Sequence, residues 1–522
     1  MKPRAGALLV LLVALAARLP ALSAARETAL GPDAAHFLNV ARCVARGHGF
    51  SNPAAWPAWL EDRTLPAPET FKDPGLPYAI AALAPIAGGL LPAGVLISML
   101  AGLALPLAVR ALALRLTGDR WTATLAGLIT AASPVLIVSS ARVMSDSAFV
   151  CALTLAFLAA APRSDAGGAR AVPRALGRAC AAGALLGAAF LVRTQALIAI
   201  PALAWLLARG AHGQRSAGGA ARIGAALACF AAVVSPLVVR NLRHFGTPLH
   251  SDATAFFVWP YLDPIAFSHG LDRPPAFAAF AAAHPGMVAG LVARNLVHLV
   301  RGATARELIG QWAWLPPLAV GAALALARPR AWGFAWAYVV PCAVVMAAMS
   351  WATRYFASLV PFLALWAALG AAWLARRIGL ERRPVALRAA VIAALALVLA
   401  LAATRAWRDA AEPAPAELAA ALAARHDPRL VLAPDEAVMA VTTSYWSWCL
   451  DRPSVHLPIT DPARVAAIAR RHRVRWATLP TSALGELAAR YPGGRLPSLF
   501  VPAWSDTAHD LTVFAVRDSA AP

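Results

Sequence analysis

The sequence predicts an all-α membrane protein, a polytopic bundle of about 11 (up to 13) transmembrane helices that carries a small extracytoplasmic α/β domain at its C-terminus. Three observations predict this class. The chain is 60% hydrophobic and only 14% charged, whereas an ordinary soluble domain has roughly 25% charged residues. Apolar runs of about 20 residues recur along the chain, which is the length that crosses a bilayer core. The basic residues gather in short loops between these runs.

The net charge of +21 does not indicate nucleic-acid binding, because the arginines lie in short runs between apolar segments and not on one face. The runs occupy the loops near 115–120, 163–178, 209–222, 328–330 and 376–388. The positive-inside rule explains this distribution and places all of these loops in the cytoplasm. The predicted spans are residues 5–24, 91–114, 121–139, 147–161, 179–192, 195–208, 223–239, 311–327, 331–350, 355–374 and 389–404.

Two segments leave alternatives open. The segment 76–89 is apolar but short, and we interpret it as an interfacial or partly inserted helix. Counting it as a full span would invert the rest of the topology. The first span, 5–24, begins after Lys2 and Arg4 and ends in small residues, so a cleaved signal peptide is its alternative.

The spans divide the chain into two predicted domains. Residues 1–404 form a transmembrane domain with long outer loops at 26–90 and 240–310. Residues 405–522 alternate between helical and strand patterns, which indicates a small α/β domain. By the topology this domain is extracytoplasmic. Its predicted helices are 416–424, 463–470 and 482–490, and its predicted strands are 430–433, 474–479 and 511–516.

Several function classes lack their motifs. There is no Walker loop, no HExxH and no GxSxG between a strand and a helix, which argues against an ATP-driven pump. The six cysteines show no CxxC spacing, so a metal–thiolate site is not expected. Cys43 and Cys449 both fall on the outer side, where either a disulfide or two unpaired thiols fits.

The first outer loop is the richest in polar residues. Apolar residues recur at helical spacing from 33 to 45, which predicts an amphipathic helix at the membrane surface with Asp33 in its first turn. Asp33 is then either a helix cap or a functional acid. Asp146 is a second acidic candidate at the outer start of a span, where Arg142 either pairs with it on one helix or shares a functional role.

Arginines at the outer ends of spans are not explained by the positive-inside rule. Arg193, Arg240 and Arg354 occupy such positions, and Tyr355 follows Arg354. A guanidinium binds phosphate in bidentate fashion, so we expect these residues to bind a lipid-linked phosphate. The alternative for each single arginine is snorkelling to the lipid headgroups.

These motifs, in this order, resemble the GT-C superfamily of polyprenyl-phosphate-sugar-dependent glycosyltransferases. The likeness is greatest to family 39, with its protein mannosyltransferases and aminoarabinose transferases, and it extends over most of the chain. The residues that carry it are Asp33, Phe37, Ala41, Gly47, Gly49, Phe50, Asp73, Pro74, Pro77, Tyr78, Arg142, Asp146, Arg193, Thr194, Arg240, Asn241, Phe245, Gly246, Pro248, Arg354 and Tyr355.

The resemblance implies an inverting glycosyltransferase in which the first-loop aspartate, here Asp33, is the general base on the acceptor. The sugar arrives on a polyprenyl phosphate, and the acceptor is a lipid, a glycan or a protein on the extracytoplasmic face. Arg193, Arg240, Arg354 and Tyr355 would bind the donor phosphate. The supporting residues are His36, Lys72, Asp73, Arg142 and Asp146.

The sequence departs from the family directly after Asp33. Ala34 follows where many relatives have an acidic residue, and His36 occupies an aromatic-like position. One carboxylate is a poor site for a hard cation unless Asp146 joins it, so metal dependence stays open. The sequence therefore assigns no cofactor, and a divalent metal held by Asp33 and Asp146 stays an open alternative.

Two other functions fit the bundle. A lipid or solute transporter or flippase would place its ionisable residues near the membrane midplane. Their position at the outer ends favours an enzyme. A sugar polymerase or ligase that uses lipid-linked oligosaccharide differs only in donor and acceptor. We expect a multi-pass protein of the bacterial plasma membrane that contacts membrane lipids and no nucleic acid.

Overall fold

A computed structural model describes residues 3–24, 30–60, 63–162, 171–209, 218–349, 351–411 and 415–517. Within these residues, seven helices are long and apolar enough to cross a membrane, or up to nine if each of two bent pairs is one span. The long helices are α1 (Pro3–Ala24), α4 (Leu90–Thr117), α8 (Ala171–Val192), α10 (Gly219–Phe245), α15 (Pro329–Ala347), α16 (Val360–Arg377) and α17 (Val385–Ala410).

Each predicted span coincides with a helix or with two consecutive helices. Shorter helices account for the spans that the long ones do not cover: α5 (Arg120–Ala131) with α6 (Pro134–Ala141), α7 (Ser145–Ala160), α9 (Ile200–Leu207) and α14 (Leu315–Leu326). Helices α5 and α6 meet at a bend of 55°. Pro134 begins α6, and a proline cannot continue the hydrogen bonding of the preceding helix, so the chain turns here.

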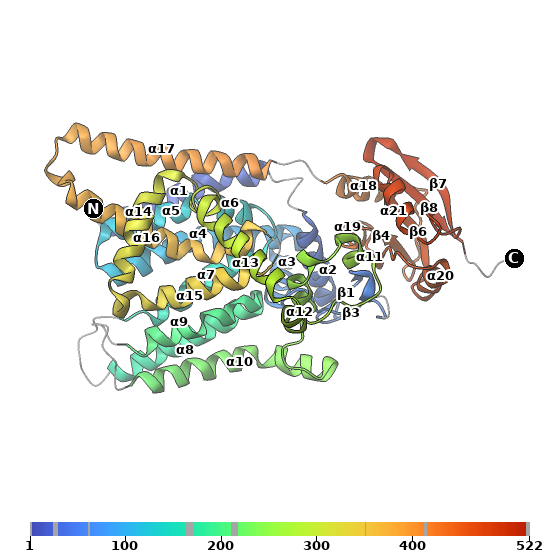
Figure 1. Ribbon diagram of the computed structural model, residues 1–522, viewed down its shortest axis with the longest axis horizontal. Coiled ribbons are helices and arrows are strands. Elements are labelled where there is room, and N and C mark those ends of the chain that lie inside the picture. The colour runs from blue at the N-terminus through green and yellow to red at the C-terminus, as the bar shows by residue number, and fades with distance from the viewer. Residues whose placement is uncertain are drawn as a thin grey trace.

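Small residues let neighbouring helices approach closely. Helices α14 and α16 touch at Gly321 and Gly370, where an added Cβ would collide with the carbonyl oxygens of Trp366 and Pro317, respectively. Such contacts replace the hydrophobic effect, which lipid cannot supply between helices. The spans therefore form one packed bundle (Figure 1).

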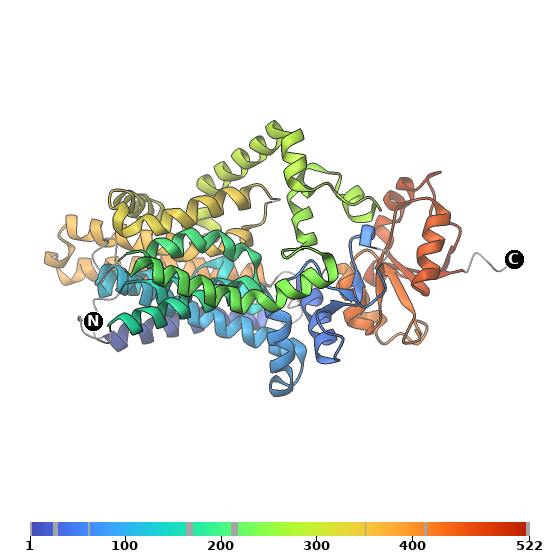
Figure 2. The same ribbon diagram turned by 90° about the horizontal axis from the view of Figure 1, so that it is seen from below.

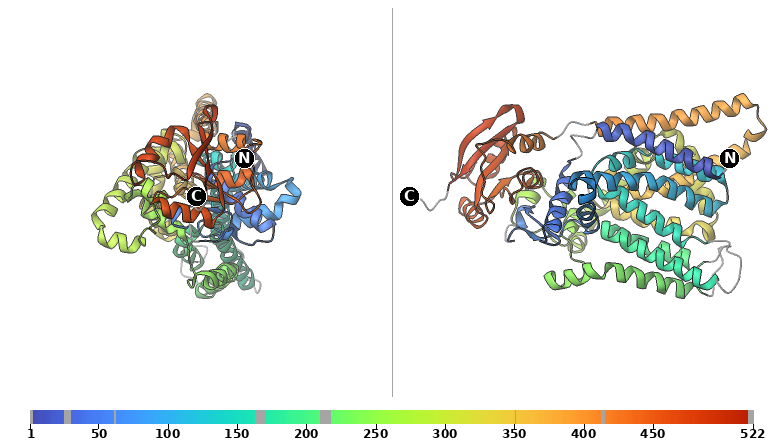
Figure 3. Two further views of the ribbon diagram at one scale, coloured as in Figure 1. Left: turned by 90° about the vertical axis from the view of Figure 1, so that its right-hand side faces the viewer. Right: turned by 180° about the vertical axis from the view of Figure 1, so that it is seen from behind.

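The two ends of the bundle differ in charge. The turn between α16 and α17 carries Arg376, Arg377, Arg382 and Arg383 and lies at the end of the bundle next to the N-terminus (Figure 1). The α/β part lies at the opposite end (Figure 3, right). Parts of two other basic loops, 163–170 and 210–217, lie outside the described residues, as do residues 25–29 of the first outer loop. The described arginines of this turn and the α/β part thus lie at opposite ends of the bundle, while the membrane side of each stays a prediction.

The first outer loop folds onto the end of the bundle. Helix α2 (Pro32–Ala45) carries Asp33, and α3 (Gly75–Ala87) is the predicted short helix at 76–89, 13 residues long. Between them lie η1 (Ala58–Leu60) and the strands β1 (Ser51–Asn52), β2 (Ala54–Ala55) and β3 (Ala67–Pro68). Strands β1 and β3 form an antiparallel pair.

The second outer segment, 240–310, is more helical than a loop. It contains η3 (Asp252–Phe257), η4 (Trp259–Tyr261), α11 (Pro264–His269), α12 (Phe277–Ala283), α13 (Pro285–His298) and the π-helical η5 (Leu299–Leu308). Residues 277–283 and 285–302 meet at 105°, and Figure 2 shows this corner projecting from the side of the bundle. Arg294, Asn295, His298 and Arg301 interrupt its apolar pattern, which is why hydropathy did not predict it.

The C-terminal part is a six-stranded α/β sheet with strand order β2-β5-β4-β6-β8-β7. Strands β2, β5, β4 and β6 are parallel, and β8 and β7 are antiparallel to their neighbours. Its elements are α18 (Ala416–Ala424), β4 (Ala437–Ala440), α19 (Thr443–Leu450), β5 (Ser454–His456), α20 (Pro462–Arg471), β6 (Val474–Pro480), η9 (Thr481–Ala483), α21 (Leu484–Arg490), β7 (Phe500–Asp506), η10 (Thr507–His509) and β8 (Leu511–Val516).

The sheet corrects part of the sequence-based interpretation. Residues 430–433 are not a strand; the strand there is β4, which begins at Ala437. The edge strand β2 comes from the first outer loop, far outside the predicted domain 405–522. A shared apolar core, with Leu38 of α2 and Trp446 of α19 among its members, joins this loop to the C-terminal part. The first outer loop and the C-terminal part therefore pack as one unit at the right-hand end of the bundle in Figure 1.

Candidate active site

Asp33 is the centre of an ionic cluster at the junction of the bundle and the outer loops. Its Oδ1 accepts a hydrogen bond from Lys72 Nζ and its Oδ2 accepts one from Arg354 Nη1. These partners are 39 and 321 residues away along the chain. The N-cap of α2, Gly31, receives no side-chain capping bond, so the Asp33 carboxylate faces the cluster and not its own helix end. Its side chain is 28% exposed, which leaves it open to a substrate hydroxyl.

A second ion pair lies in the same region. Arg193 donates to Oδ1 of Asp146, whose side chain is only 2% exposed. The aromatic ring of Tyr355 lies close to both cations, 5.9 Å from the Arg193 guanidinium carbon and 5.5 Å from that of Arg354. Tyr355 therefore links the two pairs by cation–π contacts. Lys72, Arg193, Arg354, Asp33 and Asp146 together form what we call the cation cluster.

Asp73 joins the cluster from the start of α3. Its Oδ2 accepts a 2.9 Å hydrogen bond from the Thr194 backbone N–H, directly after Arg193. This contact requires a close approach of α3 to the end of α8. A Cβ on Gly75 would lie 2.8 Å from the carbonyl carbon and oxygen of Leu191, so only glycine fits there.

A buried polar group supports the loop behind Asp33. Glu69 Oε2 lies 2.7 Å from His36 Nε2 and accepts a 2.9 Å bond from Asn52 Nδ2. Glu69 Oε1 accepts backbone N–H bonds from Thr70, Phe71 and Lys72. His36 is thus a structural partner of Glu69. The three backbone bonds fix the turn that presents Lys72 to Asp33.

Two predicted residues lie apart from the cluster. The Arg240 guanidinium donates to the carbonyl oxygens of Phe50 (3.2 Å) and Glu69 (2.7 Å), and its carbon lies 4.7 Å from the Phe50 ring centroid. It therefore ties the first outer loop to α10. Arg142 donates to the Asp409 carbonyl oxygen (3.2 Å), and Asp146 pairs with Arg193 instead. Because Arg142 follows α6 and Asp146 begins α7, the two do not share one helix face.

Three acidic residues around the site, Asp33, Glu69 and Asp73, have side-chain pKa values that differ strongly. Burial alone would raise the pKa of Asp33, but Lys72 and Arg354 outweigh it and hold that pKa well below its usual range. Burial also opposes the ionisation of Glu69, yet His36 and the backbone donors lower its pKa to about 2. In Asp73 burial prevails over the Thr194 N–H and the nearby cations, and raises its pKa to about 7.

A divalent metal does not fit this arrangement. No group of three or more His, Cys, Asp or Glu side chains that could hold a metal ion occurs among the residues that the structure describes. In Asp33 and Asp146, ammonium and guanidinium groups occupy the carboxylate oxygens that a hard cation would need. We therefore derive no step through a metal.

Two short 3₁₀ segments position Arg193 and Arg354. The segment η2 (Thr194–Ala199) begins directly after Arg193, and η7 (Thr353–Leu359) contains Arg354 and Tyr355. Gln195 joins them, because its Nε2 donates to the Tyr355 carbonyl oxygen (3.3 Å) and to Ser358 Oγ (3.2 Å). The side chain of Gln195 thus sets the spacing between the two arginine-bearing segments.

Comparison with known proteins shows which membrane enzymes the chain resembles. The family model of dolichyl-phosphate-mannose-protein mannosyltransferase matches residues 68–239, a segment that contains Lys72, Asp73, Asp146 and Arg193. Two solved glycosyltransferase structures share the fold. The oligosaccharyltransferase of Archaeoglobus fulgidus without ligand is 13% identical, with a TM-score of 0.63 over 100% of this chain and 75% of that chain. Over residues 68–239 the chain is similar to this mannosyltransferase family, and over its full length it shares the fold of these membrane glycosyltransferases.

The chain is also similar to ArnT from Cupriavidus metallidurans bound to undecaprenyl phosphate. It is 15% identical, with a TM-score of 0.56 over 98% of each chain. The archaeal oligosaccharyltransferase AglB has also been solved with an inhibitory peptide and a dolichol-phosphate, and this structure matches with a TM-score of 0.61. No curated protein sequence matches the chain. The resemblance to GT-C glycosyltransferases predicted from the sequence is confirmed, and the matched proteins are enzymes, which favours an enzyme over a transporter.

The sequence contained a signal for Lys72 beyond its place in a motif. Lys2 and Lys72 are the only lysines, although the chain has 47 lysine and arginine residues. In so arginine-rich a chain, a lysine beside an aspartate indicates a place where a compact ammonium suits better than a planar guanidinium. Glu69, three residues earlier, was not predicted as a site residue, because its partners His36 and Asn52 are brought to it only by the fold.

Proposed function

We propose that this protein is a glycosyltransferase that moves a sugar from a polyprenyl-phosphate donor to an acceptor hydroxyl, with Asp33 as general base and inversion at the anomeric carbon. The observation that carries the proposal is the contact of Lys72 and Arg354 with the two oxygens of Asp33. It places a carboxylate, which can take a proton, beside cations that can stabilise a phosphate leaving group. Proteins of the same fold have been solved with undecaprenyl phosphate and dolichol-phosphate.

The proposed reaction is a single displacement. The acceptor hydroxyl attacks the anomeric carbon, its proton passes to Asp33, and the bond to the lipid phosphate breaks. Lys72, Arg193 and Arg354 stabilise the negative charge that develops on that phosphate. Arg240, which the sequence also suggested as a phosphate ligand, acts in this proposal by holding the first outer loop in place.

Binding of the donor would itself activate the base. The pKa of Asp33 is low while Lys72 and Arg354 pair with it. A phosphate that draws these cations away removes the main cause of the low pKa, so the pKa of Asp33 rises and the carboxylate becomes a stronger base. Proton transfer is then favoured only when the donor is in place.

The acceptor is proposed to be a lipid, a glycan or a protein on the extracytoplasmic face of the bacterial plasma membrane. The separation of the α16–α17 arginines and the α/β part to opposite ends of the bundle supports this side. A second candidate function is transfer of a lipid-linked oligosaccharide. The TM-score of 0.63 to the archaeal oligosaccharyltransferase favours it.

The test is sugar transfer by the purified protein in proteoliposomes that contain polyprenyl-phosphate-linked monosaccharides or, separately, oligosaccharides. We expect Asp33→Asn to lower kcat by about 10²- to 10⁴-fold, the usual contribution of a general base. Donor affinity should not fall, because the neutral amide releases Lys72 and Arg354 for the phosphate. The control is Asp435→Asn, since Asp435 is an exposed partner of Arg473 in the C-terminal part. Transfer by Asp33→Asn at the wild-type rate would remove Asp33 as the base.

A further inference from the structure

A polar pocket lies on the far side of α2 from the cation cluster, between that helix and the C-terminal part. Its volume is about 380 Å³, within the range of small-molecule sites. It is lined by Arg42, Arg425, Leu430, Leu432, Trp448, Cys449, Leu450, Asp451 and Arg452. Three arginines against one carboxylate make its interior electropositive. Asp33 and Arg42 are nine residues apart on α2, or roughly 14 Å at the rise of an α-helix, so the pocket is separate from the cation cluster.

Two of the three arginines are already occupied by the protein. Arg42 donates to Asp451 Oδ1 (2.7 Å) and to the Trp448 carbonyl oxygen (2.8 Å), and its guanidinium carbon lies 4.3 Å from the Trp448 ring centroid. It thereby caps the C-terminal end of α19, where a cation is favoured. Arg452 donates to the carbonyl oxygens of Asp451 and Leu432. These contacts hold the Arg42 and Arg452 side chains in place along the pocket lining.

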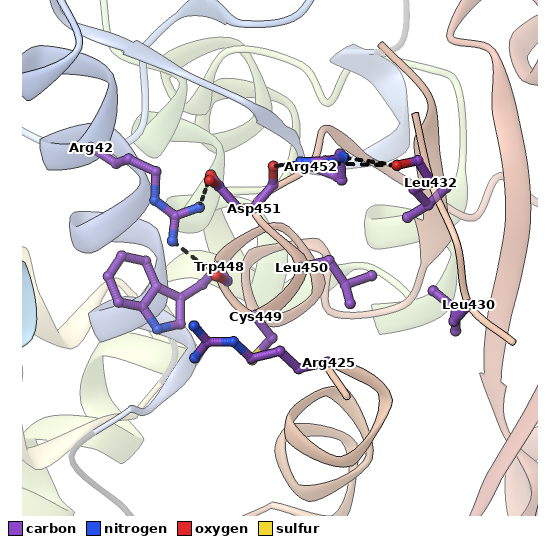
Figure 4. Close-up of a pocket in the computed structure, with 9 residues that line it drawn as sticks. All are labelled: Arg42, Arg425, Leu430, Leu432, Trp448, Cys449, Leu450, Asp451 and Arg452. Atoms are coloured by element: carbon purple, nitrogen blue, oxygen red, sulfur yellow. Dashed lines mark hydrogen bonds and ion pairs between the residues drawn. The ribbon is translucent and has the colours of Figure 1, made fainter. Parts of the chain in front are cut away.

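The third arginine, Arg425, differs from Arg42 and Arg452 in its bonding. It follows α18 and makes no hydrogen bond or ion pair with any residue that the structure describes. Figure 4 shows its side chain reaching from the end of α18 toward Trp448, while Leu430 and Leu450 lie on the other side of the pocket. Cys449, at the back, does not compete as an anion, because burial raises the pKa of its thiol to about 11. The pocket therefore presents one uncommitted guanidinium beside an aromatic and aliphatic wall.

We propose that this pocket is a binding site for a phosphate or carboxylate group attached to a less polar body. The anion would bind Arg425 in bidentate fashion, the geometry that a guanidinium favours. The body would pack against Trp448 and the leucines, as a sugar ring or the glycerol part of a lipid headgroup can. The site does not depend on the role of Asp33, because no residue that lines it belongs to the cation cluster.

The experiment measures binding of glucose 6-phosphate by calorimetry to the full-length protein in nanodiscs of phosphatidylcholine, with glucose as the uncharged control. A parallel arm counts the phosphatidylglycerol molecules that the protein retains from mixed-lipid nanodiscs by native mass spectrometry. The variants are Arg425→Glu and Arg425→Gln. The matched control is Arg429→Glu, because Arg429 lies on the same segment but pairs with Asp427 and faces Trp504.

We expect Arg425→Glu to weaken glucose 6-phosphate binding by roughly tenfold or more, in line with the loss of charged hydrogen bonds. Arg425→Gln should act in the same direction, and Arg429→Glu should leave binding unchanged. A fall in retained phosphatidylglycerol with unchanged glucose 6-phosphate binding would support the pocket with a lipid headgroup as its occupant.

Two results would overturn the proposal. One is that neither ligand responds to either change at Arg425. The other is that only Lys72→Met abolishes glucose 6-phosphate binding, because that result assigns the anion to the cation cluster. The Asp33→Asn variant should bind glucose 6-phosphate at the pocket as the wild type does, so a failure of this site and a failure of Asp33 as base are distinguishable.

Discussion

Asp33 and Asp73 lie close to the same cations, yet the pKa values of their side chains are shifted in opposite directions. Asp33 is held as a carboxylate by Lys72 and Arg354, which lower its pKa. Burial raises the pKa of Asp73 to about 7, so its charge changes in the physiological range. At residue scale, the charge of the cluster therefore depends on pH through Asp73.

We predict that donor affinity falls as pH rises through 7. Below this pH Asp73 is neutral and does not compete with a phosphate for Lys72 and Arg193. Above it the Asp73 carboxylate competes for these cations, at a cost of about 1 kcal/mol, or roughly fivefold in donor KM. The measurement is donor KM between pH 5.5 and 8.5. Asp73→Asn should give a KM that is flat across this range, and an unchanged inflection in that variant would contradict the prediction.

The same residue has a consequence for stability. Its folded-state pKa lies above the ordinary value of 3.8, so the folded protein binds more protons than the unfolded chain between about pH 4 and pH 7. The contribution of Asp73 to stability therefore decreases as pH rises through that interval. Glu69 acts in the opposite sense: its pKa of about 2 gives stability above about pH 4.5 that is lost as pH falls toward 2.

At the scale of elements, the site depends on two 3₁₀ segments, η2 and η7, that bring Arg193 and Arg354 to one place. Gln195, which lies on η2, bonds to η7 in two places: its side-chain amide donates to the Tyr355 backbone carbonyl and to the Ser358 hydroxyl. It also contacts Cys342 Sγ at 3.2 Å. Removing its amide leaves buried acceptors without a donor, which typically costs about 1–3 kcal/mol.

We predict that Gln195→Leu raises donor KM by roughly five- to tenfold, because Arg193 and Arg354 lose their fixed spacing. The matched control is Thr154→Val, a buried change on α7 that removes only a bond to the helix's own Val150 carbonyl oxygen. Both variants should lower Tm slightly. If Gln195→Leu and Thr154→Val gave the same donor KM, the spacing role of Gln195 would be wrong.

The apolar spans could be predicted because each follows from a run of nonpolar residues whose length matches the bilayer. The 3₁₀ segments could not, since Thr194–Ala199 and Thr353–Leu359 read as the first turns of ordinary apolar helices. Helix α13 could not be predicted from hydropathy either, because Arg294 and Asn295 interrupt its run of apolar residues. Asn295 is buried and donates to the Ala347 and Met349 carbonyl oxygens, a partnership that only the fold reveals.

At the scale of the molecule, the outer loops and the C-terminal part form one unit. Strand β2 of the first loop pairs with β5, and Asn39 of α2 donates to the Ser444 carbonyl oxygen of α19 at 2.9 Å. The order of motifs along the chain predicted Asp33, Lys72, Arg193 and Arg354 as members of one site. The pairing of Asp146 with Arg193 and the structural place of Arg240 required the packing of distant segments.

Contacts with distant segments hold α2, and with it Asp33, in position. Helix α1 lies beside α17, and Trp407 Nε1 donates to the Ala17 carbonyl oxygen at 2.6 Å (Figure 3, right). Arg42 and Arg46 of α2 both pair with Asp451 of the C-terminal part. Asp33 is thus positioned by elements from the beginning, the middle and the end of the chain.

The stereochemistry of the product shows whether sugar transfer is the single displacement proposed for Asp33. A polyprenyl-phosphate sugar of defined anomeric configuration is supplied to the wild-type protein, and the linkage in the first product is determined by NMR before any anomerisation. Direct attack by a hydroxyl that Asp33 deprotonates predicts a product of opposite anomeric configuration to the donor. Retention of the donor configuration would contradict the account, because it would require a covalent sugar intermediate on the protein.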